Sequence, residues 1–257
     1  MVSKELPIFM EEEIANKILR EAISCIPKGT SIYLIGGRIR NALYYNHFGK
    51  RFPSRDYDLF MSERPDKFIS NLRKIGFVYG KMKRKDEITV KKKKFEGAKE
   101  PKDHVVFDIH FTEKKTILQN LKEKSNFTIN GFAINLNKIT FKNWKSCVIS
   151  LEGAYKDLKN KQIKVNTFNH PAQIFACIRF VSQGFKPPKK KEADGLFMLL
   201  GKLRRNQLEI NINKVLEYTG GKEETLRIAR RMGINEDIFS FNTILRIRVK
   251  QRSLTLN

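Results

Sequence analysis

The chain has 257 residues, of which 40% are hydrophobic and 11% aromatic, so it can bury a sizeable core and is not an intrinsically disordered chain. Its 51 Lys and Arg residues stand against 27 Asp and Glu residues, and the formal net charge of +24 makes nucleic acid the expected partner. A solvated basic surface is the alternative. No apolar run approaches a membrane span, and the polar start does not resemble a signal peptide, so we expect a protein that is neither membrane-bound nor secreted.

The chain has three cysteines, Cys25, Cys147 and Cys177, which are widely spaced and stand in apolar surroundings. Their odd number and their spacing predict buried free thiols and argue against a disulfide framework or a zinc site. Free thiols are typical of a reducing compartment, so we expect the protein in a cytoplasm, an organelle matrix or a virion.

Helix and strand patterns alternate along the first part of the chain. Apolar residues at helical intervals predict a helix over 11–26, and a β-branched and aromatic run predicts a strand over 31–35. Gly36 and Gly37 interrupt this run, and a second helical pattern follows over 38–45. The same reasoning then predicts, in chain order, a strand at 56–60, a helix at 65–75, a hairpin of strands at 76–83 and 86–94, a strand at 105–111, a helix at 114–123 and a strand at 139–145.

Strand patterns fade after residue 150, and helical periods take over at 172–181, 196–203, 208–218 and 223–232. The sequence therefore predicts an α+β protein. Its head, over 1–150, would hold a small mixed β-sheet flanked by helices, and an all-helical neck would follow over 151–257.

Basic residues crowd two stretches, 81–102 and the segment KPPKKK at 186–191, which we expect to be a loop between helices. Either stretch could contact an RNA backbone, and a flexible solvated loop is the alternative for the first. Tyr79 and Phe95 could stack on bases, although anchoring the hairpin is the simpler interpretation. The residues predicted to bind RNA are Lys91, Lys92, Lys93, Lys94, Lys189, Lys190 and Lys191.

The strand, glycine turn and helix at 31–45 form a junction suited to phosphate, because glycines let the backbone approach closely and the first amides of a helix point at an anion. Asp56 and Asp58 follow on a strand, where residues two apart share one face. Paired carboxylates suit a hard cation such as Mg²⁺, which also takes phosphate oxygens. Together these features predict a nucleoside triphosphate site, whereas a plain chain reversal and surface charge are the alternatives for each part alone.

A third carboxylate lies on the strand at 105–111, where alternation places Asp108 and His110 on one face. Asp108 is a candidate third metal ligand, and an ordinary exposed strand residue is the alternative. We expect His110 to form a hydrogen bond at the sheet surface.

The segments GGRIRNAL at 36–43 and RDYDLF at 55–60 resemble the G-G-x-V-R-D … D-x-D signature of the class II tRNA nucleotidyltransferases and bacterial poly(A) polymerases, within the DNA polymerase beta-like superfamily. Further segments are similar to the family pattern in the same order: VVFD at 105–108, FTINGFA at 127–133, Gly153 with Asp157 and Leu158, and Arg179 with Phe180.

The resemblance implies a two-metal nucleotidyl transfer, in which Asp56, Asp58 and Asp108 hold two Mg²⁺ ions, with Mn²⁺ as the alternative. The glycine turn would cradle the triphosphate and an arginine after it would add a phosphate contact; Arg40 is the one that matches the motif. The residues implied in nucleotide binding are Gly36, Gly37, Arg38, Arg40, Asn126, Asn130, His170, Gln173 and Arg179.

The chain departs from the family pattern at three places. Asn41 stands where the family has Asp, and Lys124-Ser125-Asn126 stands where it has R-R-D. The base-reading segment E-D-x-x-R aligns with 169–173, whose Asn, His and Gln side chains can still hydrogen-bond a base edge with another selectivity. We also expect the chain to lack the longer helical body of class II enzymes, so that its basic loops, a partner subunit or a homodimer would hold RNA.

We therefore predict a template-independent RNA 3′-terminal nucleotidyltransferase that transfers a nucleotide, with AMP favoured, from ATP or another nucleoside triphosphate to the 3′ end of tRNA or mRNA. The same chemistry on another acceptor, such as a protein, a small molecule or a tRNA in a toxin role, is one alternative. A non-catalytic RNA-binding subunit is the other, although three retained carboxylates argue against it.

Overall fold

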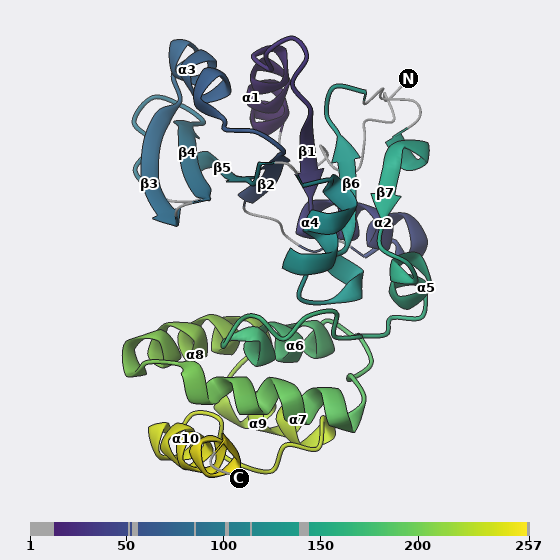
Figure 1. Ribbon diagram of the computed structural model, residues 1–257, viewed down its shortest axis with the longest axis vertical. Helices are drawn as coiled ribbons and strands as arrows, with labels where there is room; N and C mark the ends of the chain where they lie inside the picture. Colours follow the sequence, from purple (N-terminus) through teal and green to yellow (C-terminus); the bar gives the residue numbers. More distant parts are fainter. Residues whose placement is uncertain are drawn as a thin grey trace. The chain divides into compact units, whose positions relative to one another are not determined.

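The protein is described from a computed structural model, which covers residues 13–50, 52, 56–84, 86–100, 103–113, 115–138 and 144–255. The chain divides into two compact units, both drawn in Figure 1. The sheet unit comprises Met1–Glu123 and Asn130–Ala154, and the helical unit comprises Lys124–Ile129 and Tyr155–Asn257. None of the helices in these described ranges combines the length and apolar character that a membrane crossing requires.

The sheet unit is built on a seven-stranded sheet with the order β3-β4-β5-β2-β1-β6-β7. Strands β2 and β5 pair in parallel and the other neighbours pair antiparallel, so the sheet is mixed, as predicted. The strands span Ile32–Ile35 (β1), Asp56–Met61 (β2), Val78–Arg84 (β3), Glu87–Lys93 (β4), His104–Phe111 (β5), Phe132–Asn135 (β6) and Val148–Ser150 (β7).

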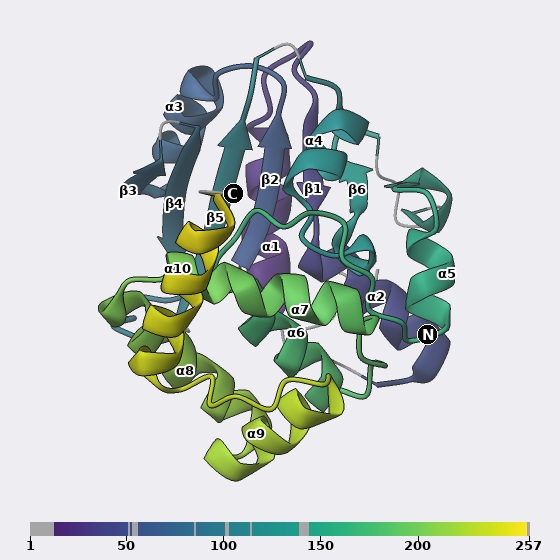
Figure 2. The same ribbon diagram turned by 60° about the horizontal axis from the view of Figure 1, so that its bottom comes forward.

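The two faces of the sheet differ in what covers them. One face carries Tyr57, Leu59 and Phe107, all fully buried, and the helices α1 (Glu13–Ser24) and α3 (Asp66–Lys74) pack on it. Figure 2 shows α1 behind the sheet and α4 (Ile117–Lys124) in front of it. The face in front carries Asp56, Asp58 and Asp108 and is called the carboxylate face below.

The helix α2 (Gly37–Phe48) follows β1 directly, and its first two turns are buried. The ring of Tyr44 on this helix packs against Phe48 and Phe52, at centroid distances of 4.5 and 4.7 Å. This aromatic cluster anchors the helix that begins at the glycine turn. A Gly49 C-cap in the left-handed conformation ends it.

The helical unit comprises α6 (Gln173–Ser182), α7 (Lys190–Leu199), α8 (Arg205–Thr219), α9 (Lys222–Arg231) and α10 (Phe241–Thr255), with most of α5 (Ala154–Lys159). Its core includes Phe180, whose ring meets Phe127 edge-on at 5.6 Å and lies 5.8 Å from Phe185. Short 3₁₀ turns occur at Thr128–Asn130, Trp144–Cys147 and Leu200–Lys202. The predicted α+β class, with a sheet-containing part and a helical part, is confirmed.

Two predicted elements need correction. Most of the strand expected at 139–145 lies outside the described residues, and Trp144 and Lys145 belong to a 3₁₀ turn, not to a strand. The segment 186–191 is a loop only in part, because Lys190 and Lys191 form the first turn of α7. The predicted strand at 86–94 is confirmed: the run from Lys91 to Lys93 is the end of β4, hydrogen-bonded to β5, so the flexible-loop alternative does not apply to it.

Candidate active site

The glycine turn between β1 and α2 lies beside a carboxylate. Gly36 has φ 74° and ψ −128°, and its amide donates a hydrogen bond of 2.9 Å to the carbonyl of Phe132 on β6. A Cβ atom at Gly36 would lie 3.7 Å from Asp58 Oδ2. The amides of Gly36 and Gly37 were both predicted to bind phosphate. That of Gly36 is hydrogen-bonded to a neighbouring strand instead, and Gly37 is the first residue of the helix.

The three predicted carboxylates lie on two neighbouring strands. The parallel register of β2 and β5 pairs Asp58 with Asp108, and Asp56 with Val106, so all three carboxylates are on one face. Asp108 is buried, Asp58 is half-buried and Asp56 is exposed at the start of β2. On the edge of β2 that is opposite to β5, Asp58 pairs with Ile35 of β1, the residue just before the glycine turn.

The donor chemistry of this cluster fits Mg²⁺, because carboxylate oxygens are the ligands that hard divalent cations prefer. Nevertheless, no three His, Cys, Asp or Glu side chains among the described residues are close enough together to form a ready metal site. Asp58 and Asp108 are direct neighbours, whereas Asp56 lies two residue pairs further along the strand, opposite Val106. The cluster therefore offers a pair of carboxylates with a third nearby, and other ligands would have to complete a metal shell.

Asp108 is held in place from the neighbouring strand. Thr89 on β4 pairs with Asp108 in the antiparallel register, and its hydroxyl donates a 2.5 Å hydrogen bond to Asp108 Oδ1. One carboxylate oxygen is thereby fixed toward β4. Sequence analysis did not select Thr89, because its role depends on a strand register that no local pattern reveals.

Arg38 ties the start of α2 to the strand that carries the first two carboxylates. Its Nε donates a 3.1 Å hydrogen bond to the carbonyl of Asp56, and its guanidinium carbon lies 3.5 Å from the ring centroid of Tyr57. Arg38 is buried. The contacts of this predicted phosphate-binding residue therefore include the backbone and an aromatic ring of β2.

Arg40 is buried and forms a hydrogen-bond network with two amide side chains, of which Asn41 is buried and Asn130 half-buried. Its Nε and Nη2 donate hydrogen bonds of 3.0 and 2.7 Å to Asn41 Oδ1, and Nη1 donates to Asn130 Oδ1. Asn41 in turn donates through Nδ2 to the carbonyl of Phe52 at 3.2 Å. Asn41 thus accepts from Arg40 at the position where the family pattern has an acidic residue, and the structure brings the predicted residues Arg40 and Asn130 together.

The other predicted nucleotide-binding residues belong to the helical unit. Gln173 is buried, and its Nε2 donates to the carbonyls of Asn126 and Thr167 at 3.0 and 2.7 Å. His170 is exposed, and its Nδ1 accepts a 3.2 Å hydrogen bond from the amide of Ala172.

Arg179 is the remaining predicted residue of this group. Its guanidinium carbon lies 5.2 Å from the ring centroid of Phe180 and 5.0 Å from that of Tyr218. The structure therefore joins Asn126 and Gln173 by a hydrogen bond, while Arg179 contacts aromatic rings.

The predicted RNA-binding lysines of β4 alternate between the two faces of the sheet. Lys91 pairs with Val106 of β5, and Val106 pairs with Asp56 of β2. Lys91 therefore points to the carboxylate face, as does Lys93 two residues later. Both lysines are exposed. Lys92 points to the other face, where its Nζ lies 2.8 Å from Glu21 Oε2 on α1. Lys94 follows the strand, and its amide donates to the carbonyl of Asp103 at 2.9 Å.

The second lysine cluster begins α7. Lys189 and Lys191 are exposed, whereas Lys190 Nζ contacts Asp194 Oδ1 at 2.7 Å and the carbonyl of Gly233 at 2.6 Å. Lys190 therefore links the start of α7 to the turn that follows α9.

Comparisons with known proteins agree with this fold. The Poly A polymerase head domain matches residues 32–164, just over half of the chain. Among solved structures, "tRNA-processing enzyme (apo form I)" has a TM-score of 0.64 at 22% identity, covering 88% of this chain and 59% of that one. The Thermotoga maritima CCA-adding enzyme complexed with tRNA has a TM-score of 0.65 at 20% identity, covering 90% and 54%.

A CCA-adding enzyme in complex with ATP is similar to the same degree, with a TM-score of 0.64 at 22% identity, covering 90% of this chain and 53% of that one. The chain thus spans little more than half the length of these structures. No curated protein matches it. The head-domain match and the motifs from Gly36 to Asp108 together show that the chain belongs to the Poly A polymerase head-domain family, the group of class II tRNA nucleotidyltransferases and poly(A) polymerases.

Proposed function

We propose that the chain is an RNA 3′-terminal nucleotidyltransferase, which transfers a nucleotide, with AMP favoured, from a nucleoside triphosphate to the 3′ hydroxyl of an RNA without a template. The observation that carries the proposal is the register that sets Asp58 beside Asp108, next to the glycine turn at Gly36. Solved structures of CCA-adding enzymes with tRNA, CTP and ATP, to which the fold is similar, support the choice of RNA and nucleoside triphosphates as substrates.

In this proposal Asp58 and Asp108 hold Mg²⁺ and Asp56 joins them from the exposed start of β2, in the family's two-ion arrangement with Mn²⁺ as the alternative. The chemistry that such ions supply when bound is activation of a hydroxyl nucleophile and neutralisation of the leaving pyrophosphate. Thr89 keeps Asp108 in one orientation through its hydrogen bond. Gly36 leaves the space beside Asp58 without a side chain.

The substrate's polyphosphate would lie at the start of α2, where amides from Gly37 onward point out of the helix N-terminus. Arg40, held by Asn41 and Asn130, would add positive charge close to this point. Lys91 and Lys93 would carry the RNA backbone along the carboxylate face, since Lys91 is in one cross-strand row with Asp56. The high net positive charge favours RNA over a small neutral acceptor.

The test is an extension assay with the purified chain, Mg²⁺ and each labelled nucleoside triphosphate in turn. The acceptors are a tRNA without its 3′ CCA, the complete tRNA and an unstructured RNA. Asp58→Asn is expected to lower the extension rate by about a hundredfold or more, because it removes a charge from the metal-binding pair. Asp103→Asn, a carboxylate in the loop before β5, is the matched control and should keep the rate.

Equal rates in Asp58→Asn and in the control would refute the assignment of the site. RNA binding without any extension by the unmodified chain would instead favour the non-catalytic RNA-binding subunit. Extension of none of the three RNAs, together with weak RNA binding, would favour a different acceptor for the same chemistry.

A further inference from the structure

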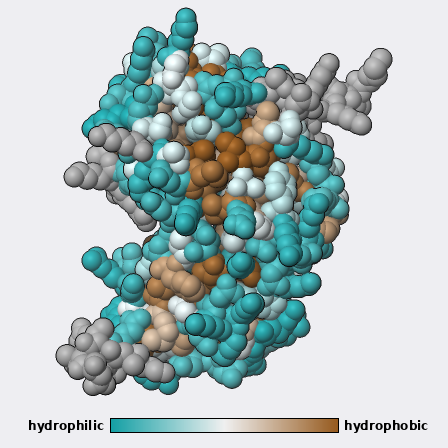
Figure 3. Space-filling view, turned by 45° about the vertical axis from the view of Figure 1, so that its right-hand side comes forward, coloured by the Kyte–Doolittle hydropathy of each residue, from teal (hydrophilic) through white to brown (hydrophobic). Residues whose placement is uncertain are grey.

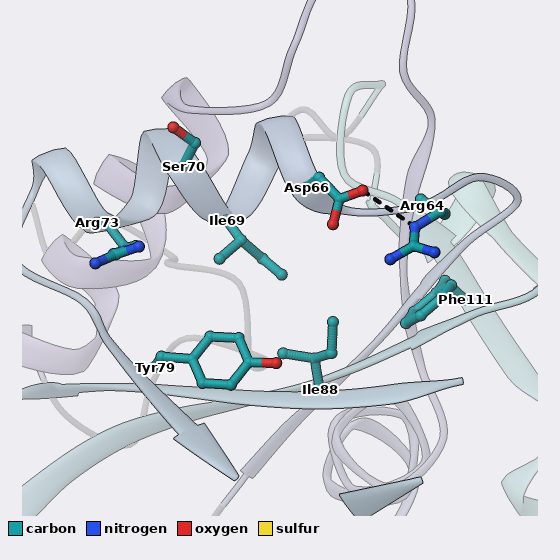
Figure 4. A pocket seen from close by; sticks show the side chains of 8 residues that line it. All are labelled: Arg64, Asp66, Ile69, Ser70, Arg73, Tyr79, Ile88 and Phe111. Carbon is teal, nitrogen blue, oxygen red and sulfur yellow. Dashed lines mark hydrogen bonds and ion pairs between the residues drawn. The ribbon is translucent and has the colours of Figure 1, made fainter. Parts of the chain in front are cut away.

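A cavity of about 350 Å³ lies between α3 and the strands β3 and β4 in the sheet unit (Figure 4). It is on the face of the sheet opposite to the carboxylates. Ile88, which lines it, pairs with Ile109, the residue after Asp108, and successive strand residues point to opposite faces. The cavity is therefore separate from the candidate active site.

Apolar side chains line the middle of the cavity, and an aromatic ring lies at one side of it. Ile69 of α3 faces Ile88 of β4 across the cavity in Figure 4, and both are buried apart from the atoms that line it. Tyr79 on β3 lies beside them and is 48% exposed, so its ring is accessible as a stacking surface. Such a slot suits a flat ring system, because apolar side chains can pack on both of its faces and an aromatic ring lies at its side.

The two ends of the cavity are polar, and they differ. Arg73 lies at the end of α3 near Tyr79, whereas Arg64 and Asp66 form a 3.1 Å ion pair at the opposite end, as Figure 4 shows. The lining residues carry two guanidinium groups and one carboxylate, so the net charge favours an anion, which Arg73 is placed to bind. The ion pair offers donors and acceptors side by side, the pattern that a nucleobase edge requires.

We propose that this cavity binds a nucleoside phosphate, with the base between Ile69 and Ile88 and beside Tyr79, and with the phosphate on Arg73. The volume of about 350 Å³ lies at the lower end of the range for small-molecule sites, which fits one nucleotide unit. The unit is either a free nucleotide or one residue of a single-stranded RNA. Because the site faces away from the carboxylates, the inference does not depend on the proposed catalysis.

The test records isoleucine methyl signals of the complete chain by NMR without divalent metal. The δ1-methyl signals of Ile69 and Ile88 are assigned through Ile69→Val and Ile88→Val. Titration with AMP, and separately with a six-residue oligoadenylate, is expected to shift both signals saturably. A shift with AMP identifies a free nucleotide as sufficient, and a shift with the oligonucleotide alone identifies an RNA segment as the ligand.

Two matched variants make the test specific. Arg73→Gln and Lys74→Gln each remove one positive charge from the last turn of α3, but only Arg73 lines the cavity. Arg73→Gln is expected to weaken binding about tenfold or more, because it removes a charge-assisted hydrogen bond, and Lys74→Gln should leave it nearly unchanged. Unmoved isoleucine signals with both ligands, or equal weakening by the two variants, would overturn the proposal.

Discussion

At the residue scale, Gly36 and Gly37 look interchangeable in the sequence but differ in the structure. Gly36 has φ 74° and ψ −128°, a backbone conformation that residues other than glycine rarely adopt. A Cβ at Gly37, in contrast, would make an ordinary contact 3.6 Å from Arg40 Nη2. Gly36→Ala is therefore expected to lower the free energy of unfolding by about 1–3 kcal/mol. Gly37→Ala should change it by less than about 1 kcal/mol. Chemical denaturation measures both, and equal values would contradict the expectation.

A second residue-scale prediction concerns pH. Burial raises the pKa of the Cys177 thiol, and the nearby Glu192 carboxylate raises it further. The folded-state pKa of this thiol exceeds its unfolded-state value of about 8.5. Below that pH the thiol is protonated in both states and stability does not depend on its titration. Above it only the unfolded chain loses the proton, so the free energy of unfolding decreases as the pH rises. Between pH 7 and pH 10 the unmodified chain should lose more stability than Cys177→Ala, as measured by urea denaturation.

The same cysteine gives an independent chemical readout. In the folded chain Cys177 should resist iodoacetamide at pH 8.5, while Cys25 and Cys147, which are half-buried, should react sooner. Mass spectrometry of timed digests distinguishes the three sites. Rapid labelling of Cys177 under native conditions would show that its surroundings open.

The candidate carboxylates could be selected from the sequence because each carries a local pattern. Asp56 and Asp58 stand two apart on a strand, and Asp108 lies in an alternating run. The parts played by Thr89 and Tyr57 could not be selected, because a hydrogen bond to Asp108 and a ring beneath Arg38 depend on strand register. A shift of one residue would move each side chain to the other face.

At the element scale, strand β4 places the lysines of one continuous run on two different faces of the sheet. Lys91 and Lys93 are on the carboxylate face, and Lys92 is paired with Glu21 on the other. Lys91→Ala and Lys93→Ala are each expected to weaken RNA binding and to reduce the slope of log affinity against log salt by about 1. Lys92→Ala is the matched control. It should leave affinity unchanged and cost at most about 1 kcal/mol of stability.

Fluorescence anisotropy with a labelled single-stranded RNA at several salt concentrations measures these slopes. Equal loss of affinity in all three variants would mean that the lysines act through net charge alone. An effect confined to Lys92→Ala would contradict the face assignment.

Elements with strong periodicity were predictable, and those defined by tertiary contacts were not. The hairpin of β3 and β4 and the helices α1 and α3 were expected from apolar spacing. The helix α10 was not predicted, since its apolar and basic residues are mixed around the helix. Its position depends on side-chain hydrogen bonds to other segments, from Arg248 to the carbonyls of Gly201 and Leu203, and from Gln251 to that of Met198.

At the scale of the whole molecule, one short segment belongs to a different unit from its neighbours in the sequence. Lys124–Ile129 is part of the helical unit, although Asn130–Ala154 returns to the sheet unit. Thr128 donates from its hydroxyl to Asp157 Oδ2 at 2.6 Å, and its amide donates to the carbonyl of Lys164 at 3.0 Å. A linear reading of the sequence places a boundary at one residue, whereas the chain enters the helical unit twice. The functional division into a catalytic head and an RNA-contact neck stays a prediction.

The charge of the molecule is also a whole-chain property. Hydrophilic side chains cover most of the face in Figure 3, with apolar patches among them, and the formal net charge is +24. Among the predicted RNA contacts, Lys91, Lys93, Lys189 and Lys191 are exposed, whereas the Nζ atoms of Lys92 and Lys190 contact Glu21 Oε2 and Asp194 Oδ1. If each of the exposed lysines neutralises one phosphate of a single strand, log affinity should fall against log salt with a slope of about −3.

Anisotropy titrations of a labelled unstructured RNA from 50 to 300 mM KCl, over which the Debye length falls from about 14 to about 6 Å, measure this slope. Polyglutamate as competitor separates RNA recognition from attraction to any polyanion, because it has charge but neither sugar nor base. We expect RNA to compete at a much lower concentration than polyglutamate, when both concentrations are expressed as negative charges. Equal competition by both polymers, or a slope near zero, would mean that the basic surface is only solvated and that RNA is not the partner it selects.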